Sequence, residues 1–358
     1  MAFDGITVAN IAKELNDTLT GGRIYKIAQP ENDELLLTIK TTDGGQKRLL
    51  ISASASLPLI YLTEKNKPSP MTAPGFCMLL RKHLQNGRIT KITQPGLERI
   101  LHIHIEHLDE MGDLCQKRLV VEIMGKHSNI IFINDRNMII DSIKHISGMV
   151  SSVREVLPGR DYFVPLTQDK ADPFILTLED FKKRITGKAM PIYKALYSAY
   201  TGLSPVISHE ICTRGGLDGD CSTAFFLESP EGETMLSALY QAFEKIMKQV
   251  KDRDFSPNIV YENGNPAEYA SIPLISFGKA DRRDFSSISK LLESYYAEKN
   301  QLSRIRQKSV DLRKIVQTAL ERNIKKYDLQ LRQMKDTEKK DKYRIYGELL
   351  NTYGYHAA

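Results

Sequence analysis

The amino-acid sequence predicts an α+β fold in which a sheet-rich N-terminal domain, a helical domain and one long helix follow each other along the chain. Between residues 22 and 62, and again between 88 and 146, apolar and polar residues alternate as in strands that bury one face. Across residues 173–254 the apolar residues recur at helical spacing. Residues 279–346 contain neither glycine nor proline, so a single helix can run through them. We therefore expect domains at 1–165, 173–254 and 286–358, with a short β-like connecting segment at 255–285.

The composition is that of a globular protein of two or three domains. The chain has 358 residues, of which 41% are hydrophobic, so each domain can bury a core. Its four cysteines form no C-x-x-C pair, which fits neither a zinc ribbon nor a dense disulfide framework. The N-terminus lacks a basic region ahead of an apolar core, and no uncharged stretch reaches the length of a membrane span. We expect a cytoplasmic protein with reduced thiols and no membrane partner.

The excess positive charge lies in the last segment. The formal net charge is +6, and residues 286–358 alone contain 16 Lys and Arg against 9 Asp and Glu. A basic extended segment suits a polyanion such as RNA. A lysine-rich helix that is merely well solvated is the alternative, and charge by itself favours it.

The first domain is expected to contain several short antiparallel strands and two helices. An amphipathic stretch near residues 8–19 predicts the first helix. The second lies in FCMLLRKHLQNG, with Gly87 placed to end it, and LPGRDYFVP is expected to form the linker that closes the domain. Four strands are predicted in GRIYKIAQ, ELLLTIKT, KRLLISAS and PLIYLTE.

The helical domain contains a candidate nucleic-acid-binding hairpin. In LYSAYTGLSPVISHEICTRGG, residues 201–204 join two short helices, with Ser204 as N-cap and Pro205 at the first helical position. This is close to a helix-hairpin-helix, whose amides meet a nucleic-acid backbone, and it makes Gly202 and Ser204 candidate RNA contacts. Ser204 stands where the second hairpin glycine is usual, and a purely structural hairpin fits about as well. Helices are expected around residues 178–185, 190–200, 205–214 and 232–250.

The last segment predicts a helix of about 90 Å with an apolar seam. A seam of that length needs a partner helix. We expect the chain to be a fragment whose continuation supplies an antiparallel partner, with a homodimer as the alternative. The two heptad rows are Ile288, Tyr295, Leu302 and Val316, and Leu291, Ile305, Leu312 and Ala319.

The stretch QPGLERILHIHIEHLDEMGD combines three histidines with acids in a strand pattern. Pro95 and Gly96 predict a tight turn. Period two then places His102, His104 and Glu106 on one face. Zinc would need a further ligand from a neighbouring strand, and the sequence offers no obvious one. A solvated sheet face is therefore the favoured interpretation, and no metal or other cofactor is expected.

Directly after that turn, Glu98 and Arg99 place a carboxylate beside a planar set of donors. Arg donates bidentately to guanine and a carboxylate accepts from exocyclic amines, so the pair suits the reading of base edges. A local ion pair is the simpler alternative and, from the residues alone, the favoured one. Two further basic clusters are candidate RNA contacts: Arg81, Lys82 and His83 on a helix, and Lys126, His127, Ser128 and Asn129 in a turn.

Several of these motifs, in this order, resemble the NFACT family: FDGI, FCMLLRKHL, GLERI, EIMGKHSNIIFIN, DSIKHIS, LPGRDY and YGELL, from Phe3 to about Tyr353. The resemblance implies an NFACT-N domain similar in fold to the formamidopyrimidine-DNA glycosylases, a helix-hairpin-helix domain and the first arm of a coiled coil, without the family's C-terminal NFACT-R region.

The resemblance implies a factor of ribosome-associated quality control. Such factors bind a large ribosomal subunit obstructed by peptidyl-tRNA and recruit alanyl-tRNA for untemplated alanine tailing, while the ribosome performs peptide transfer. The family's tRNA-recognition pair, most often Asp-Arg, falls on Glu98 and Arg99, and an N-terminal acid implicated in tailing falls on Asp4. The rRNA of the large subunit is the second expected RNA partner.

Two other functions fit the sequence less well. The glycosylases use an N-terminal proline amine and a zinc finger, whereas position 2 is Ala and no four-cysteine set exists. The sequence also lacks a G-x-S-x-G motif, a Walker loop and a dinucleotide fingerprint, so no enzymatic activity is expected. A fibronectin-binding surface adhesin is the runner-up, and it conflicts with the lack of an export signal.

Overall fold

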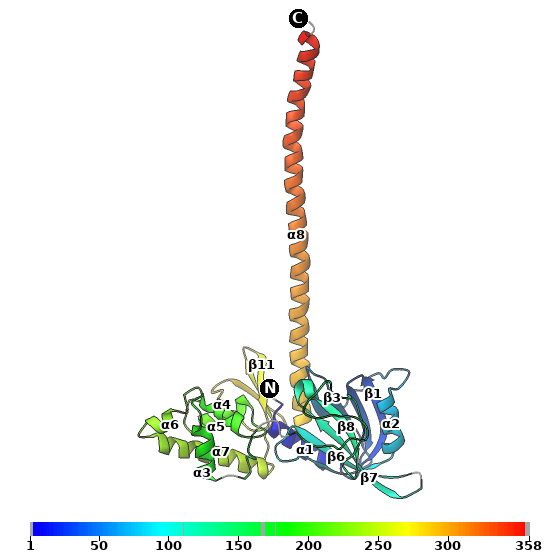
Figure 1. The fold of residues 1–358 in the computed structure, drawn as a ribbon, viewed down its shortest axis with the longest axis vertical. Coiled ribbons are helices and arrows are strands. Elements are labelled where there is room, and N and C mark those ends of the chain that lie inside the picture. The colour runs from blue at the N-terminus through cyan, green and yellow to red at the C-terminus, as the bar shows by residue number, and fades with distance from the viewer. Residues whose placement is uncertain (1–2, 110, 166–168, 176, 355–358) are drawn as a thin grey trace. The chain divides into compact units, whose positions relative to one another are not determined.

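The computed structural model describes residues 3–109, 111–165, 169–175 and 177–354, and the side chains of residues 300–311 lie outside this description. The chain forms two compact units, Met1–Tyr296 and Ala297–Ala358. Figure 1 shows the order of the elements along the chain.

A nine-stranded sheet dominates the larger unit. Its order is β4-β3-β2-β1-β5-β6-β7-β8-β9, and every neighbouring pair is antiparallel. The four strands predicted between residues 22 and 62, and the period of two after residue 88, are confirmed. The strands are β1 (Arg23–Glu31), β2 (Glu34–Lys40), β3 (Gln46–Ala53), β4 (Pro58–Thr63), β5 (Arg88–Thr93), β6 (Ile100–Leu108), β7 (Leu114–Glu122), β8 (Asn129–Asn134) and β9 (Ile139–Ser142).

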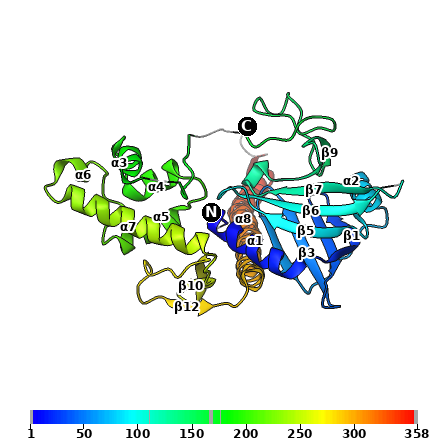
Figure 2. The same cartoon turned by 90° about the horizontal axis from the view of Figure 1, so that it is seen from below.

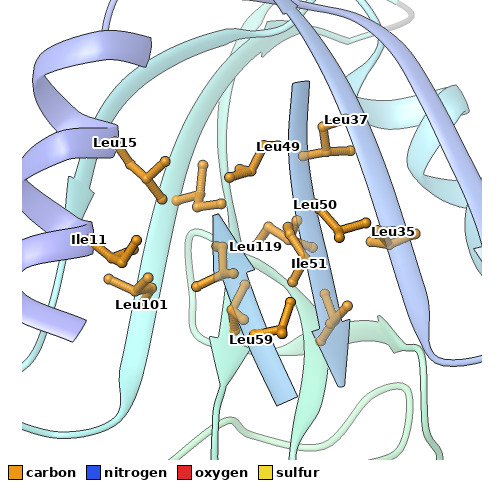
Figure 3. Close-up of a cluster of buried hydrophobic side chains, with 14 of the residues drawn as sticks. Ile11, Leu15, Leu35, Leu37, Leu49, Leu50, Ile51, Leu59, Leu101 and Leu119 are labelled. Carbon is orange, nitrogen blue, oxygen red and sulfur yellow. The ribbon is translucent and has the colours of Figure 1, made fainter. Parts of the chain in front are cut away.

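The sheet curls so that its two halves share one apolar core. Leu49 and Ile51 on β3 lie near Leu119 on β7, and all three side chains are fully buried (Figure 3). Helix α1 (Gly5–Leu19) packs Ile11 and Leu15 against the same core. Each such side chain contributes about 1.5–3 kcal/mol by leaving water. This core therefore fixes the strand ends from which the candidate site is built.

Helix α2 (Gly75–Leu84) ends three residues before the glycine that was expected to end it. Asn86, with a φ of 65°, makes the left-handed step after the helix. Gly87 serves a different purpose, because a Cβ there would lie 2.8 Å from Cγ2 of Ile105 and 3.0 Å from the carbonyl oxygen of Leu84. The prediction that Gly87 stops the helix was therefore wrong, since the residue allows β5 to pass close to β6.

The segment expected to be a linker packs back onto the sheet. Val156 and Tyr162 are buried in a small cluster with Ile100, Val120 and Ile131 from the outward faces of β6, β7 and β8. The residues around LPGRDY thus cover part of the sheet instead of leaving it, and they form one wall of the candidate site.

The helical domain contains the four predicted helices and one short additional helix. Phe181, Tyr200 and Phe243 form its aromatic centre, with ring centroids 4.9–5.9 Å apart. Figure 2 shows the arrangement of these helices. They are α3 (Leu178–Thr186), α4 (Ile192–Ala199), α5 (Pro205–Arg214), α6 (Phe225–Glu228) and α7 (Gly232–Lys251).

The short β-like segment forms a three-stranded sheet of β10 (Asn258–Glu262), β11 (Asn265–Ala270) and β12 (Asp281–Asp284), in the order β11-β10-β12. Ile259 packs into the core of the nine-stranded sheet, whereas its neighbour Val260 packs into the helical core. Because successive strand residues point to opposite faces, this sheet joins the two cores.

Helix α8 (Ile288–Tyr353) confirms the predicted long helix and has 66 residues. Its first turns belong to the larger unit, where Leu291 and Tyr295 are buried and Glu14 of α1 accepts hydrogen bonds from the amide and hydroxyl of Ser289 at 3.0 and 2.6 Å. In the second unit its seam side chains are exposed, including Leu312 and Val316 at 62% and 65%. The side chains of Leu302 and Ile305 lie outside the described residues, and the partner helix stays a prediction.

Within the described part of the chain, no helix has both the length and the apolar character that crossing a membrane would require.

Candidate nucleic-acid interface

Three segments that are far apart in sequence meet at the start of α1. They are residues 3–5, the loop of residues 94–99 before β6, and the hairpin of residues 201–204 before α5. The amide of Gly5 donates to the carbonyl of Gly202 at 2.9 Å. The side-chain amide of Gln94 donates to the carbonyls of Gly5 and Glu98 at 2.9 and 2.8 Å. The sheet domain and the helical hairpin are thus joined through their main chains.

Two glycines allow this close approach. Gly202 has a φ of +81°, which glycine tolerates best, and a Cβ there would lie 2.4 Å from the carbonyl oxygen of Leu97. A Cβ on Gly5 would lie 2.1 Å from the same oxygen. The space beside the hairpin glycine is therefore occupied by the chain's own loop, and the hairpin is held against that loop.

Asp4 is buried at the centre of this junction, with 6% of its surface exposed. Its carboxylate caps α1 by accepting from the amide of Thr7 at 2.8 Å, and it accepts from the hydroxyl of Ser204 at 2.7 Å. Burial raises its pKa, and the hydrogen bonds from Ser204 and Thr7 oppose that rise. Ser204 also caps α5, accepting from the amide of Ile207 at 3.3 Å. The serine in place of a hairpin glycine thus supplies a bond that glycine cannot make.

A cleft of about 660 Å³ opens beside the junction. Glu98, Arg99 and Lys170 are half-buried in its lining. Burial raises the pKa of Glu98, and the positive charges of Arg99 and Lys170 oppose that rise. The pKa of Lys170 is lowered by burial and by the positive charge of Arg99. The cleft therefore presents one acceptor and two cationic donors in a partly desolvated setting. Its apolar lining comes from Phe3, Leu97, Met124, Val153, Val164 and Leu203.

A buried ion pair supports the wall formed by residues 151–165. Glu122 at the end of β7 is completely buried and bonds to Arg154 and to the hydroxyl of Tyr162, the latter at 3.0 Å. The guanidinium of Arg154 also lies over the ring of Tyr162, 5.5 Å from its centroid. Burial raises the pKa of Glu122 and Arg154 opposes it. Although Arg154 lines the cleft, its charge is therefore largely engaged by Glu122.

Many of the predicted site residues lie in one place. Four segments, separated by up to 200 residues in sequence, supply them. The cleft can therefore hold a polar ligand between a carboxylate, two cations and main-chain groups. Six of the predicted residues line it together: Asp4, Glu98, Arg99, His127, Gly202 and Ser204.

The other residues of the Lys126–Asn129 cluster differ in whether their side chains are exposed or buried. Lys126 is exposed beside His127 in a 3-10 turn. Ser128 and Asn129 are buried and bond to the chain itself: the Ser128 hydroxyl accepts from the amide of Met124 at 2.8 Å, and the Asn129 amide group bonds to the main chain of Lys144 at 2.9 and 3.1 Å. These two residues shape the turn, and only Lys126 and His127 offer exposed side chains.

The cluster on α2 lies apart from the cleft. Arg81 donates from Nε to the carbonyl of Ile27 at 2.9 Å, and Nδ1 of His83 lies 3.1 Å from Nζ of Lys117. The ring of His83 also lies 6.4 Å from that of His107, at the opposite end of β6 from the cleft. The two ends of that strand are about 26 Å apart. Lys82 is exposed in the same turn of α2.

His102, His104 and Glu106 of β6 share one face, as predicted. In the described residues no group of three His, Cys, Asp or Glu side chains could hold a metal ion. His102 is covered by Tyr162, with ring centroids 6.2 Å apart, and burial together with Arg118 lowers its pKa to about 4. The expectation of a solvated face was therefore wrong at His102, because the loop after β9 covers this residue.

Two cleft residues, Arg154 and Lys170, were missed by reasoning from the sequence. Both lie in irregular segments, where neither periodicity nor a motif singles out a position. Arg154 bonds to Glu122, which lies 32 residues away in the chain. Local spacing therefore carries no signal that could have found either residue.

Known proteins resemble this chain over nearly its whole length. The family described as NFACT N-terminal and middle domains matches residues 4–358. A relative from Bacillus subtilis named "Rqc2 homolog RqcH" is 35% identical over 99% of this chain and 59% of its own length. The human protein "Ribosome quality control complex subunit NEMF" is 22% identical over 97% of this chain and 32% of its own length. This chain thus spans about three fifths or less of the curated relatives it matches.

A solved structure has the same architecture. The structure of a protein named as the fibrinogen binding protein from Staphylococcus aureus has a TM-score of 0.69 and 30% sequence identity, and the match covers 83% of this chain and 99% of that one. On the match over residues 4–358, together with this fold, the chain belongs to the NFACT family.

Proposed function

We propose that this chain is the RNA-binding part of a ribosome-associated quality-control factor. In this proposal it binds a large ribosomal subunit obstructed by peptidyl-tRNA and recruits alanyl-tRNA for untemplated alanine tailing. The names of its relatives, "Rqc2 homolog RqcH" and "Ribosome quality control complex subunit NEMF", support the pathway. The observation that carries the role in tRNA recognition is the meeting of Glu98, Arg99 and the hairpin of residues 201–204 in one cleft.

The cleft would discriminate between tRNAs through base edges. Arg99 would donate to guanine, and the carboxylate of Glu98 would accept from an exocyclic amine. A well-formed contact of this kind contributes about 1–3 kcal/mol of discrimination. Partial burial of both side chains strengthens such contacts, because fewer waters compete for them. The glutamate carries one methylene more than the aspartate usual in the family, so its carboxylate would reach further into the cleft.

Asp4 would act as a positioning residue. Its carboxylate is engaged by Thr7 and Ser204, so it fixes the hairpin and the start of α1 beside the Glu98–Arg99 loop. Contact with RNA would fall to the accessible side chains, among them Lys126 and His127. In this proposal the chain itself forms no covalent bond, and the ribosome transfers the peptide.

Sequencing the RNA that co-purifies with the protein from cells tests the pathway. The expected result is enrichment of large-subunit rRNA and of one tRNA species. Recovery of no RNA, together with tight binding of fibronectin or fibrinogen, would instead favour the adhesin that the names of the solved relatives suggest.

The Arg99→Ala variant tests the role of the cleft. It should reduce the preference for alanyl-tRNA over other tRNAs by about 5- to 150-fold, which corresponds to the 1–3 kcal/mol above. General affinity for RNA should fall much less. Arg184→Ala, at an exposed position on α3 outside the cleft lining, is the matched control. Equal weakening for all tRNAs by Arg99→Ala would contradict base reading by this residue.

A further inference from the structure

A second surface of the sheet domain carries unbalanced positive charge. On the outward face, main-chain pairing places Lys40 of β2 opposite Arg23 of β1, and Arg23 opposite Arg88 of β5. A second line of side chains runs parallel to the first, with Lys91 of β5 opposite His104 of β6 and His104 opposite Arg118 of β7. We give the name basic rows to five of the cations on this face: Lys40, Arg23, Arg88, Lys91 and Arg118.

The basic rows are only partly balanced, because one carboxylate, that of Glu106 on β6, lies opposite Arg88. Like charges directly opposite each other on neighbouring strands are destabilising. Four of the five side chains are exposed, the exception being the half-buried Arg118, which donates to Asn137. In the part of the chain that the structure describes, no carboxylate lies within ion-pair distance of Arg23 or Arg88.

Three neighbours of the basic rows determine the charge and chemistry of this face. Glu106, opposite Arg88, bonds to Gln116 at 3.3 Å. The pKa of His104 is lowered to about 4, first by burial and then by Lys91 and Arg118, so this histidine adds no positive charge at neutral pH. Tyr25 is 47% exposed on the same part of the sheet, with Nζ of Lys40 4.2 Å above its ring. The surface thus combines exposed cations with an accessible aromatic ring, as nucleic-acid-binding faces do.

The basic rows and the cleft lie on the same side of β6. Tyr162 covers His102 on the outward face of that strand, and the loop that carries Tyr162 also supplies Arg154 and Val164 to the cleft lining. His104 follows His102 on the same face. His104 lies opposite Lys91 and Arg118, and it is five positions from Arg99, a distance of about 17 Å along an extended chain. One RNA molecule can therefore reach both surfaces.

We propose that the basic rows bind the sugar–phosphate backbone of the same tRNA whose bases are read in the cleft. This inference rests on the proposed function and extends it to a second contact surface. The rows run across several strands, so they can follow one backbone over the face of the sheet. Phosphate contacts of this kind supply affinity and orientation without sequence preference, whereas the cleft supplies the preference.

The salt dependence of tRNA binding tests this proposal. The double variant Arg88→Gln/Lys91→Gln should lower affinity for alanyl-tRNA and for other tRNAs by the same factor. The slope of log K against log salt concentration should become shallower by about 1.4–1.8, as expected for the loss of two phosphate contacts. Arg23→Gln/Lys40→Gln, on strands β1 and β2, should act in the same direction and provides a second variant if the first fails to fold.

Lys245→Gln/Lys248→Gln is the matched control, because it removes the same charge from exposed positions on α7. An unchanged salt slope in both row variants, or an equal change in the control, would overturn the assignment. Loss of binding to the large ribosomal subunit with tRNA binding intact would also overturn it.

Failure of this inference can be told apart from failure of the proposed function. If Arg99→Ala removes tRNA preference while the row variants bind tRNA as the wild type does, only the basic rows lose their role. If the wild-type protein binds no tRNA, both proposals fall.

Discussion

Gly202→Ala tests whether the hairpin must touch the loop that carries the acid–arginine pair. The new methyl group would lie 2.4 Å from the carbonyl oxygen of Leu97 and 2.6 Å from its Cβ. Both neighbours are atoms of a buried residue, so one of the two main chains has to move. The backbone at position 202 is also left-handed, with a φ of +81°.

Two contributions therefore lower the free energy of unfolding. A left-handed conformation costs an alanine about 1–2 kcal/mol, and forcing extra volume into a packed site costs about 1–3 kcal/mol more. Gly216→Ala separates them, because Gly216 has a similar φ of +73° but nothing within 4 Å of its Cβ position. The control should show the first contribution and lack the second.

Urea unfolding of both variants measures the difference. Gly202→Ala should be less stable than Gly216→Ala by about 1–3 kcal/mol, and it should also weaken the preference for alanyl-tRNA because the loop of residues 94–99 shifts. Equal loss of stability in the two variants would refute the argument, since it would mean that the hairpin and the loop separate at little cost.

Three further predictions concern the supports of the cleft, and urea titrations check each of them. Burial lowers the pKa of His102 to about 4, so between pH 6.5 and 4 the unfolded chain binds a proton at this residue and the folded protein does not. The free energy of unfolding should therefore fall as the pH drops from 6.5 to 4. It should fall less steeply in His102→Gln. Arg154→Ala should cost about 3–5 kcal/mol, because it leaves the buried carboxylate of Glu122 without its cation. Ser204→Ala should cost about 1–3 kcal/mol, because it removes the cap of α5 and a donor to buried Asp4.

Local patterns in the sequence predicted most of the elements, because strand and helix periods depend on which face is buried. Strand β6 alternates as expected from Leu101 to Glu106, and α5 begins where Ser204 and Pro205 predicted. The mistake at Gly87 has a physical cause. A glycine after a helix can serve either a left-handed turn or a close approach of chains, and only the neighbouring strand at Ile105 decides between them.

The supports of the cleft could not be predicted in the same way. The family resemblance singled out Asp4, but its hydrogen bond to Ser204 joins residues 200 positions apart. Lys170 lies in an irregular segment and matters only because the fold brings it beside Glu98. Contacts of this kind depend on the packing of whole domains, about which alternation and spacing carry no information.

The way the cleft is supported explains how a small pair of charges could choose between similar RNAs. Hydrogen bonds discriminate between bases when a wrong base leaves a buried polar group of the protein unpaired. This requires that the protein's donor and acceptor be held in place, so that they cannot move to pair with the wrong base. The side-chain amide of Gln94 donates to the carbonyls of Gly5 and Glu98 and so holds the loop that carries Glu98 and Arg99. A phosphate-binding face has no such requirement, because any RNA offers the same backbone. In the proposed function, rigid contact at the cleft would supply the preference for one tRNA, and exposed, adaptable cations on the sheet would supply the affinity.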